Sequence, residues 1–429
     1  MHYFAYKNGI LHAEDVPVPV IAEQVGTPFY CYSTATLSRH FEIFDAAFGD
    51  MDHLTCYAMK ANSNQAVLKT LGDLGAGMDI VSGGELKRAL AAGIVADKII
   101  FSGVGKTKTE ITAALDAGIL CFNVESESEL YLISAVAAAM GKIANISLRI
   151  NPDVDARTHA KISTGKAENK FGIPWTRAIE VYDLAASLPG LRVAGIDLHI
   201  GSQIVDLEPY QTAYARIGEL VKTLRARGHD IQHVDMGGGL GIPYARGDKE
   251  PPLPAEYATI IKKTVGDLGC RIITEPGRLI AGNAGILVAR VIHMKRGEDK
   301  YFAVIDAAMN DLIRPTLYEA HHDILTVIEP SGDAEMRIID VVGPVCETGD
   351  YSATDRELPV LRQDDLIAIM SAGAYGAVQS GTYNTRALIP EVLVRGDEFA
   401  IVRKRLEIKD IIELDQTAPW QQATNPPKS

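Results

Sequence analysis

Cysteine is scarce in this sequence. There are five cysteines in 429 residues, an odd number, and no two of them form a C-x-x-C pair. This count and spacing argue against a disulfide framework and against a zinc site, so no metal is expected and a reducing cytoplasm fits best. The five residues are Cys31, Cys56, Cys121, Cys270 and Cys346.

Positive charge is also in short supply. The 42 lysine and arginine residues are outnumbered by 55 acidic residues, which gives a net charge of −13. A protein that tracks nucleic acid needs a basic face, and one that binds an anionic membrane needs clustered basic residues, so neither partner is expected. The negative net charge does not exclude a local basic pocket that binds an anionic cofactor.

Long apolar runs are absent as well. No stretch approaches the ~20 apolar residues that a membrane helix needs. The N-terminal segment, MHYFAYKNGILHAEDV, has charges within its apolar part and is not expected to be a secretory signal. The final stretch, residues 416–429, is polar and contains prolines, so we predict a flexible tail there.

The sequence does show a regular alternation of short apolar runs and amphipathic, alanine- and leucine-rich segments. This alternation predicts parallel strands joined by helices, and eight strands match the size of a closed (β/α)8 TIM barrel. A helix at 34–48, capped near Ser33, can supply the eighth outer helix, so we expect the barrel domain at 34–282. The predicted strands are 54–59, 77–81, 98–102, 120–124, 145–150, 193–199, 231–236 and 270–275.

The pattern changes after Gly282. From there to residue 415, short strand-like segments are separated by turn residues, and helical signals are few. Near the N-terminus, Asn8-Gly9 lies between alternating residues, which is typical of a tight β-hairpin. We therefore predict a second, all-β domain, a sandwich or a β-barrel, made of residues 1–33 and 283–415.

Several barrel strands end in residues that can do chemistry. Active sites of such barrels lie at the C-terminal ends of the strands, so these residues are expected on one rim. They come from different strands and include a lysine, an imidazole, a glycine-rich turn and a carboxylate–arginine pair. The residues are Lys60, Asp79, Arg149, His199, Gly237-Gly-Gly239, Glu275 and Arg278.

Each of these residues also has an ordinary structural explanation. A lysine at a strand end can extend its ammonium to solvent, and a lone histidine is more often a hydrogen-bonded structural residue than a ligand. A triple glycine can be no more than a tight turn. The coincidence of four such groups on one rim is what favours a shared chemical role.

Together these groups match the needs of pyridoxal 5′-phosphate. A lysine amine condenses with an aldehyde, and stacked glycine N–H groups cradle a phosphate. A carboxylate beside a pyridine nitrogen keeps that nitrogen protonated, so the ring accepts electrons, and an imidazole can cover one face of the ring. The set therefore predicts a pyridoxal-phosphate site.

Four motifs carry a family resemblance. They are Tyr57-Ala-Met-Lys-Ala-Asn62, His199-Ile-Gly-Ser-Gln203, Gly237-Gly-Gly-Leu-Gly241 and Glu275-Pro-Gly-Arg278. In this order and spacing they resemble the fold-type III, alanine-racemase-like decarboxylases, a group that includes enzymes for ornithine, arginine and diaminopimelate. The resemblance spans nearly the whole chain. It implies a cofactor-bearing barrel, a β domain and a head-to-tail homodimer with two active sites at the interface.

The resemblance also implies roles for individual residues. Lys60 is similar to the lysine that bonds with the cofactor aldehyde. His199 is similar to the residue stacked on the cofactor ring, and Glu275 to the partner of the pyridine nitrogen. The other cofactor-binding positions implied are Ser202, Gly238 and Gly239 for the phosphate, then Gly277, Arg278 and Tyr375, with Asp79 and Arg149 nearby.

Three further motifs lie in the second domain: Arg314-Pro-Thr-Leu-Tyr318, Cys346-Glu-Thr-Gly-Asp350 and Ala372-Gly-Ala-Tyr-Gly376. Taken singly, each is explained by packing or by a buried thiol. As a group they suit a substrate whose far end carries both a carboxylate and an ammonium. An arginine grips the carboxylate in bidentate fashion, and an acid holds the ammonium.

These motifs resemble the branch of the family that acts on diaminopimelate. The resemblance implies that Cys346 enters from the partner subunit and returns a proton to the product, so that Lys60, His199 and Cys346 are the catalytic residues. The implied substrate-binding residues are Arg278, Arg314, Tyr318, Glu347 and Tyr375.

The implied reaction is the decarboxylation of meso-2,6-diaminopimelate to L-lysine and CO₂, a carboxy-lyase step that ends lysine biosynthesis. A decarboxylase for ornithine, arginine or carboxynorspermidine is the nearest alternative, although Arg314 would repel a bare ammonium. A non-catalytic pyridoxal-phosphate-binding protein would not need Cys346, Arg314 and Tyr375. A racemase would need a second base, which the sequence does not identify.

One long polar segment, residues 151–172, follows the fifth predicted strand on the same rim. Long loops at this position are often lids, and a solvent-exposed connection is the equal alternative.

Overall fold

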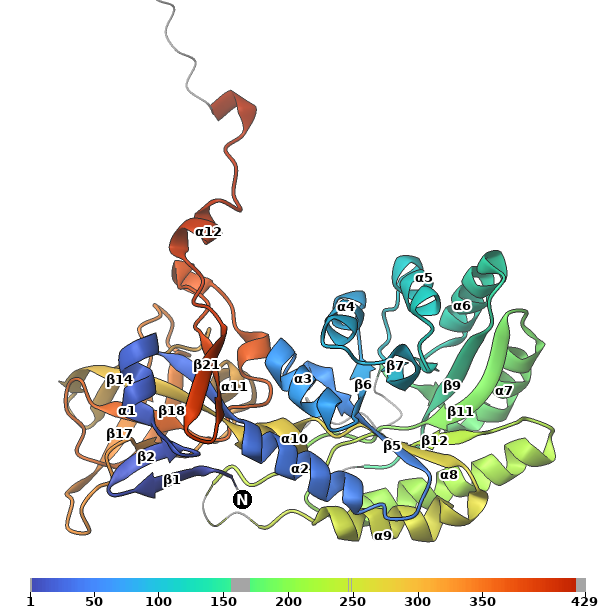
Figure 1. Ribbon diagram of the computed structural model, residues 1–429, viewed down its shortest axis with the longest axis horizontal. Helices are drawn as coiled ribbons and strands as arrows, with labels where there is room; N and C mark the ends of the chain where they lie inside the picture. Colours follow the sequence, from blue (N-terminus) through green and yellow to red (C-terminus); the bar gives the residue numbers. More distant parts are fainter. Residues whose placement is uncertain (1, 156–169, 246, 248, 422–429) are drawn as a thin grey trace, which may run out of the picture.

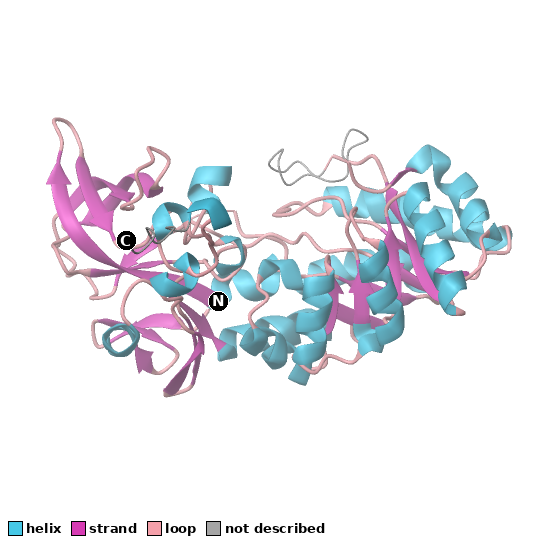
Figure 2. Ribbon diagram, turned by 90° about the horizontal axis from the view of Figure 1, so that it is seen from above, coloured by secondary structure: helices cyan, strands magenta, loops and turns pink. Residues whose placement is uncertain are grey.

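The computed structural model describes residues 2–155, 170–245, 247 and 249–421. These residues form a barrel of strands and helices next to a domain built mostly of sheet (Figure 1). Seen from above, the strands of the two parts form separate groups along the long axis (Figure 2). Of the predicted tail, residues 422–429 lie outside the described part, and η9 (Pro419–Gln421) forms one turn in the rest.

The barrel is closed by eight parallel strands. Their order is β5-β6-β7-β8-β9-β11-β12-β13, and β13 pairs with β5 to complete the ring. All eight predicted strands are confirmed. Their bounds are β5 (His53–Ala58), β6 (Gly77–Ile80), β7 (Ile99–Phe101), β8 (Cys121–Val124), β9 (Ala144–Asn151), β11 (Leu191–Asp197), β12 (His233–Asp235) and β13 (Arg271–Thr274). A short strand, β10 (Ile173–Pro174), adds to β9 on the outside of this ring.

Helices surround the barrel strands, as the amphipathic segments predicted. In the first of them, α2, the Ser33 hydroxyl caps the N-terminus by accepting from the Thr36 N–H at 3.0 Å. Leu37, Phe41 and Phe44 of α2 lie on one face and are buried, and α2 packs beside α3 and α9, so the predicted eighth outer helix is confirmed. The helices are α2 (Thr34–Ala46), α3 (Gln65–Asp73), α4 (Gly83–Ala91), α5 (Lys108–Ala117), α6 (Glu127–Met140), α7 (Ala178–Ser187), α8 (Glu208–Ala226) and α9 (Pro254–Val265).

The second part of the molecule centres on one large sheet. Its strand order is β18-β17-β15-β14-β4-β20-β21, and β19 pairs with both β14 and β16. The strands are β4 (Phe29–Ser33), β14 (Gly285–Arg296), β15 (Tyr301–Ile305), β16 (Ile324–Thr326), β17 (Met336–Val342), β18 (Tyr351–Pro359), β19 (Leu366–Ile369), β20 (Glu391–Arg395) and β21 (Glu398–Arg403). Three short helices join these parts or follow them: α10 (Arg278–Ala281), α11 (Arg314–Tyr318) and α12 (Ile408–Ile412).

The N-terminal hairpin is confirmed and packs on this sheet. β1 (Phe4–Lys7) and β2 (Ile10–Ala13) pair across Asn8-Gly9, and β3 (Val16–Pro17) completes a three-stranded sheet. The Leu11 N–H donates to the Val327 carbonyl at 2.8 Å. The proline-containing segment that follows forms a helix, α1 (Val18–Val25), which the sequence pattern did not predict.

Besides the two-residue strands β3 and β10, two longer strands were not predicted. β4 consists of five fully buried residues directly before the α2 cap, and it lies between β14 and β20. β18 has a run of polar and charged residues, and the apolar residues that it buries, Ala353 and Leu358, do not alternate in a regular strand pattern. No helix in the described part of the chain is both long and apolar enough to cross a membrane.

Candidate active site

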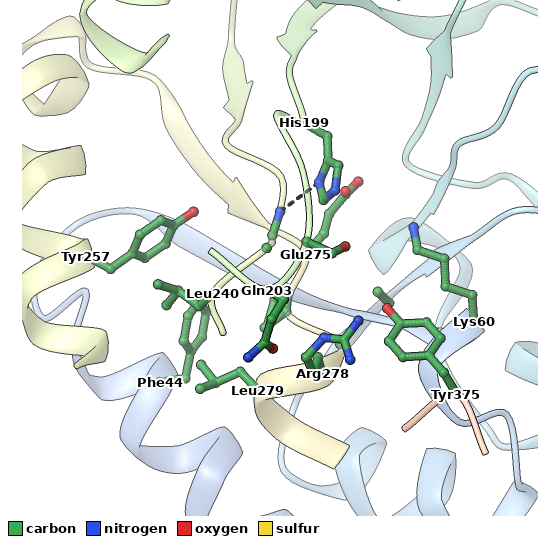
Figure 3. A pocket seen from close by; sticks show the side chains of 16 residues that line it. Phe44, Lys60, His199, Gln203, Leu240, Tyr257, Glu275, Arg278, Leu279 and Tyr375 are labelled. Carbon is green, nitrogen blue, oxygen red and sulfur yellow. Dashed lines mark hydrogen bonds between the residues drawn. The ribbon is translucent and has the colours of Figure 1, made fainter. Parts of the chain in front are cut away.

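A cavity of about 690 Å³ lies at the C-terminal ends of the barrel strands, where the barrel faces the sheet domain. A second hollow of about 20 Å³ shares several of its walls and reaches the glycine-rich turn (Figure 3). The barrel contributes Lys60, Arg149, His199, Ser202, Gly238, Gly239, Glu275, Gly277 and Arg278, and the sheet domain contributes Arg314, Tyr318 and Tyr375.

Lys60 follows β5 in the short turn η1 (Met59–Ala61). It lies deep in the protein, yet 41% of its side chain is exposed because it faces the cavity, and its Nζ is 3.3 Å from Oδ2 of the buried Asp79. Burial lowers the pKa of Lys60, but Asp79 and Glu275 raise it, and the net pKa is above the usual value. The lysine is therefore an ammonium that must lose its proton before it can bond with an aldehyde.

His199 lies two residues beyond the end of β11. Its Nδ1 accepts from the Gly238 N–H at 3.3 Å, so the ring proton is on Nε2 (Figure 3). Burial, helped by Arg149 and Lys60, lowers the pKa of His199 well below its usual value. The side chain is thus a flat, neutral ring facing the cavity.

The glycine-rich turn tolerates no side chain. A Cβ atom on Gly238 would lie 2.2 Å from the Glu275 carbonyl oxygen, and one on Gly239 would lie 2.2 Å from the Gly201 carbonyl oxygen. Gly239 also has a φ of +105°, which L side chains rarely adopt. Three backbone segments therefore meet closely beside Ser202, which is the kind of cradle that fits a phosphate group.

Glu275 belongs to a buried acidic group. Oxygens of Asp197, Asp235 and Glu275 all lie within 4.8 Å of one another. The Asn123 amide donates to Asp235 at 3.2 Å and to Glu275 at 3.4 Å. Burial and then Asp235 raise the pKa of Glu275 well above its usual value, and burial raises the pKa of Asp235 to about 6. A protonated pyridine nitrogen would add a positive charge beside these crowded carboxylates and favour the ionised form of Glu275, so the residues present fit pyridoxal phosphate.

Arg149, predicted near the cofactor, lines the cavity and pairs with Glu125 at 2.9 Å. Its guanidinium carbon lies 4.8 Å from the Phe171 ring centre. Of the candidate lid 151–172, residues 156–169 lie outside the described part of the chain.

Two predicted residues are not at the cavity of this chain. Cys346 and Glu347 are exposed, and neither lines the cavity, although the Cys346 N–H is held by the Asn384 side chain at 3.1 Å. Arg314, Tyr318 and Tyr375, from the same domain, do reach it.

Several residues at the cavity were not predicted from the sequence: Asp197 and Tyr244 line it, whereas Asp235 and His322 contact lining residues from behind. Asp197 and Asp235 end β11 and β12, so the rule that picked out Lys60 and Glu275 would have found them. Tyr244 and His322 lie in loops without a motif. Their position depends on the packing of the barrel against the sheet domain.

Comparison with known proteins identifies the family to which this chain belongs. The family described as pyridoxal-dependent decarboxylase, pyridoxal binding domain, matches residues 34–282. A diaminopimelate decarboxylase from Haemophilus influenzae is 50% identical over 418 residues, covering 97% of this chain and 100% of that one. The chain belongs to the diaminopimelate decarboxylase family.

Other members of the family agree in sequence and in structure. A diaminopimelate decarboxylase from Vibrio cholerae is 52% identical over 98% of this chain and 100% of its own length. The crystal structure of the Helicobacter pylori family member complexed with L-lysine is 41% identical, with a TM-score of 0.88 over 92% of this chain and 98% of that one. The fold, the decarboxylase class and the pyridoxal-phosphate cofactor predicted from the sequence are confirmed.

Proposed function

We propose that this chain decarboxylates meso-2,6-diaminopimelate to L-lysine and CO₂, the last step of lysine biosynthesis. One observation carries the choice of substrate. Two buried arginines, Arg278 and Arg314, line the same cavity as Lys60. A substrate with a bare ammonium at its far end would be repelled by them, whereas diaminopimelate presents a carboxylate there. The names of the family members support the same substrate.

The cofactor-binding roles are part of this proposal. Lys60 would bond with the cofactor aldehyde, and His199 would lie against the cofactor ring. Ser202, Gly238 and Gly239 would hold the phosphate, and Glu275 would keep the pyridine nitrogen protonated. Gly277, Arg278 and Tyr375 complete the cofactor site, with Asp79 and Arg149 beside it.

When bound, pyridoxal phosphate supplies an electron sink for the pair released as CO₂ leaves. Glu275 keeps the proton on the pyridine nitrogen, which makes that sink effective. Arg278 and Arg314 hold the far carboxylate, with Tyr318 and Tyr375 beside them. Lys60 would hold the cofactor through its amine, which lies beside Asp79. Cys346 returns a proton to the carbon that lost CO₂, and Glu347 holds the far ammonium.

Cys346 and Glu347 require a second subunit in this scheme. Both side chains are exposed in the single chain, whereas the other proposed substrate-binding residues of this domain, Arg314, Tyr318 and Tyr375, line the cavity. We propose a cytoplasmic homodimer in which the loop at 346–350 of each subunit completes the site of the other. The proposed domain boundaries are 34–282 for the barrel and 1–33 with 283–415 for the β domain.

Replacing Cys346 with alanine should leave the cofactor bound but slow lysine formation about 10²-fold, because a general acid is lost. Mixing this variant with Lys60→Ala tests whether sites are shared. Random reassociation makes half of the dimers mixed, and each mixed dimer has one site with both residues intact, so about a quarter of the wild-type activity should return. If Cys346 serves its own chain, the mixture stays at the average of its two components.

The substrate is tested by measuring CO₂ and amine product from meso-diaminopimelate, ornithine, arginine and lysine in parallel, with pyridoxal phosphate present. We expect lysine from diaminopimelate and no product from the other three. Activity on ornithine or arginine instead would keep the fold and cofactor but overturn the assignment of Arg314.

A further inference from the structure

Three arginines line the cavity, and two of them, Arg278 and Arg314, have no acidic partner among the described residues. Arg278 and Arg314 are 7% and 5% exposed, and none of the ion pairs in the described part of the chain involves either residue. The Nε atom of Arg278 is buried without any hydrogen-bond partner there. Burying unpaired cations is costly, so a pocket that keeps two of them is suited to an anionic ligand.

Neutral groups hold these arginines in place. Arg278 donates from Nη1 to the Tyr244 hydroxyl, and its guanidinium carbon lies 4.8 Å from the Tyr375 ring centre. The guanidinium carbon of Arg314 lies 4.8 Å from the Tyr244 ring centre. Aromatic faces and hydroxyls orient a guanidinium without neutralising its charge. Tyr244 therefore lies between the two cations and leaves both available to a ligand.

His322 holds Arg314 from the other side. The Arg314 Nε donates to His322 Nε2 at 3.2 Å, and His322 Nδ1 lies 2.8 Å from the Met370 carbonyl oxygen. A carbonyl oxygen only accepts, so Nδ1 carries the ring proton. A guanidinium only donates, so Nε2 carries none. His322 is therefore neutral and fixed in one tautomer.

The surroundings of His322 maintain this state. The residue is fully buried, and its ring meets the edge of Tyr244 at a centroid distance of 5.2 Å. Burial, followed by the charge of Arg314, lowers the pKa of His322 to about 3. Arg314, His321 and Arg278 all oppose its protonation through their charge.

This contact decides which edge of the guanidinium can bind a ligand. A guanidinium grips a carboxylate through a pair of N–H groups, either Nε with one terminal nitrogen or the two terminal nitrogens together. His322 occupies Nε. No hydrogen bond in the described part of the chain uses the two terminal nitrogens of Arg314, which lines the cavity.

We propose that His322 is a positioning residue that fixes Arg314 with its terminal nitrogens toward the cavity, and so selects substrates with a carboxylate at the far end. This inference rests on the proposed function and deepens it. His322 does not touch the reacting atoms; it acts through Arg314, and Tyr244, which contacts both side chains, supports the same arrangement.

The test uses two substitutions that differ in one contact. His322→Asn places a polar group where Nδ1 lies, so it can still donate to Met370, but it is too short to reach Arg314. His322→Gln is longer and offers an acceptor to the Arg314 Nε. His293→Asn, at an exposed position on β14, serves as the matched control.

Two ligands isolate the far carboxylate. L-Lysine and cadaverine (1,5-diaminopentane) carry the same amine for the cofactor and differ in that carboxylate. In His322→Asn holoenzyme we expect the KM for meso-diaminopimelate and the dissociation constant of L-lysine each to rise about tenfold, the loss of one charge-assisted contact. The dissociation constant of cadaverine and the cofactor absorbance spectrum should not change. His322→Gln should recover most of the L-lysine affinity.

Three results would overturn the inference. They are an unchanged L-lysine affinity in His322→Asn, an equal weakening of L-lysine and cadaverine, or a His322→Gln variant no better than His322→Asn. Failure of the proposed function is recognised separately, since wild-type protein would then form no lysine from diaminopimelate. The difference in affinity between the two ligands still decides the role of His322 in that case.

Discussion

Lys60→Ala is expected to reduce CO₂ release from meso-diaminopimelate by on the order of 10⁴-fold or more. Losses of this size are typical when one member of a group of cooperating catalytic residues is removed. The lysine is the only cavity residue proposed to bond with the cofactor and to release the product from it. Its amine lies beside Asp79 and faces the cavity, with no other lysine among the cavity-lining residues of the described chain to replace it. Single-turnover CO₂ release measures the loss.

The same variant has a spectroscopic signature. The visible absorbance of the lysine-bound cofactor should disappear, while cofactor held by the glycine-rich turn and Glu275 can still bind. Lys69→Ala is the matched control, because Lys69 lies on the exposed face of α3 and pairs with Asp73. Turnover in Lys60→Ala comparable to that control would refute the scheme.

Arg314→Met is expected to lower kcat/KM for meso-diaminopimelate by roughly 10²- to 10³-fold, or about 3–4 kcal/mol, the cost of removing one partner of a buried charge pair. Methionine keeps much of the side-chain volume and stays apolar, so packing against Tyr244 is largely retained. The far carboxylate of the substrate would then meet Arg278 alone.

The separate changes in KM and kcat show whether Arg314→Met impairs substrate binding or the chemical step. Because Arg314 grips a group remote from the reacting carbon, KM should rise more than kcat falls. Arg337→Met, on β17 where Arg337 pairs with Glu335, is the control and should behave as wild type. A change in Arg314→Met no larger than in this control would remove Arg314 from the substrate site.

The barrel could be predicted because its signal is local. Each strand is an apolar run and each helix an amphipathic segment, and the rule that places active sites at strand ends located Lys60, His199 and Glu275. Turn glycines such as Gly239 are equally readable, because backbone crowding and a positive φ leave no alternative residue.

Other features depend on contacts between distant segments. β4 runs directly into the cap of α2, so no turn marks its end, and it is a strand because β14 and β20 flank it. The positions of Tyr244 and His322 depend on how the barrel packs against the sheet domain. That packing cannot be predicted from any single segment of the sequence. Cys346 illustrates a further limit, since its proposed role depends on a second copy of the chain.

The pairing of β4 with β14 has a consequence for synthesis on the ribosome. These strands adjoin in the sheet, yet roughly 250 residues, the whole barrel, lie between them in the chain. At about 5–20 residues per second, β4 emerges tens of seconds before any of its partners. The barrel can fold in that interval, whereas β4 must wait with an apolar surface uncovered. The sheet domain is therefore the last part to fold, and Arg314 and Tyr375 join Lys60 only when the chain is nearly finished.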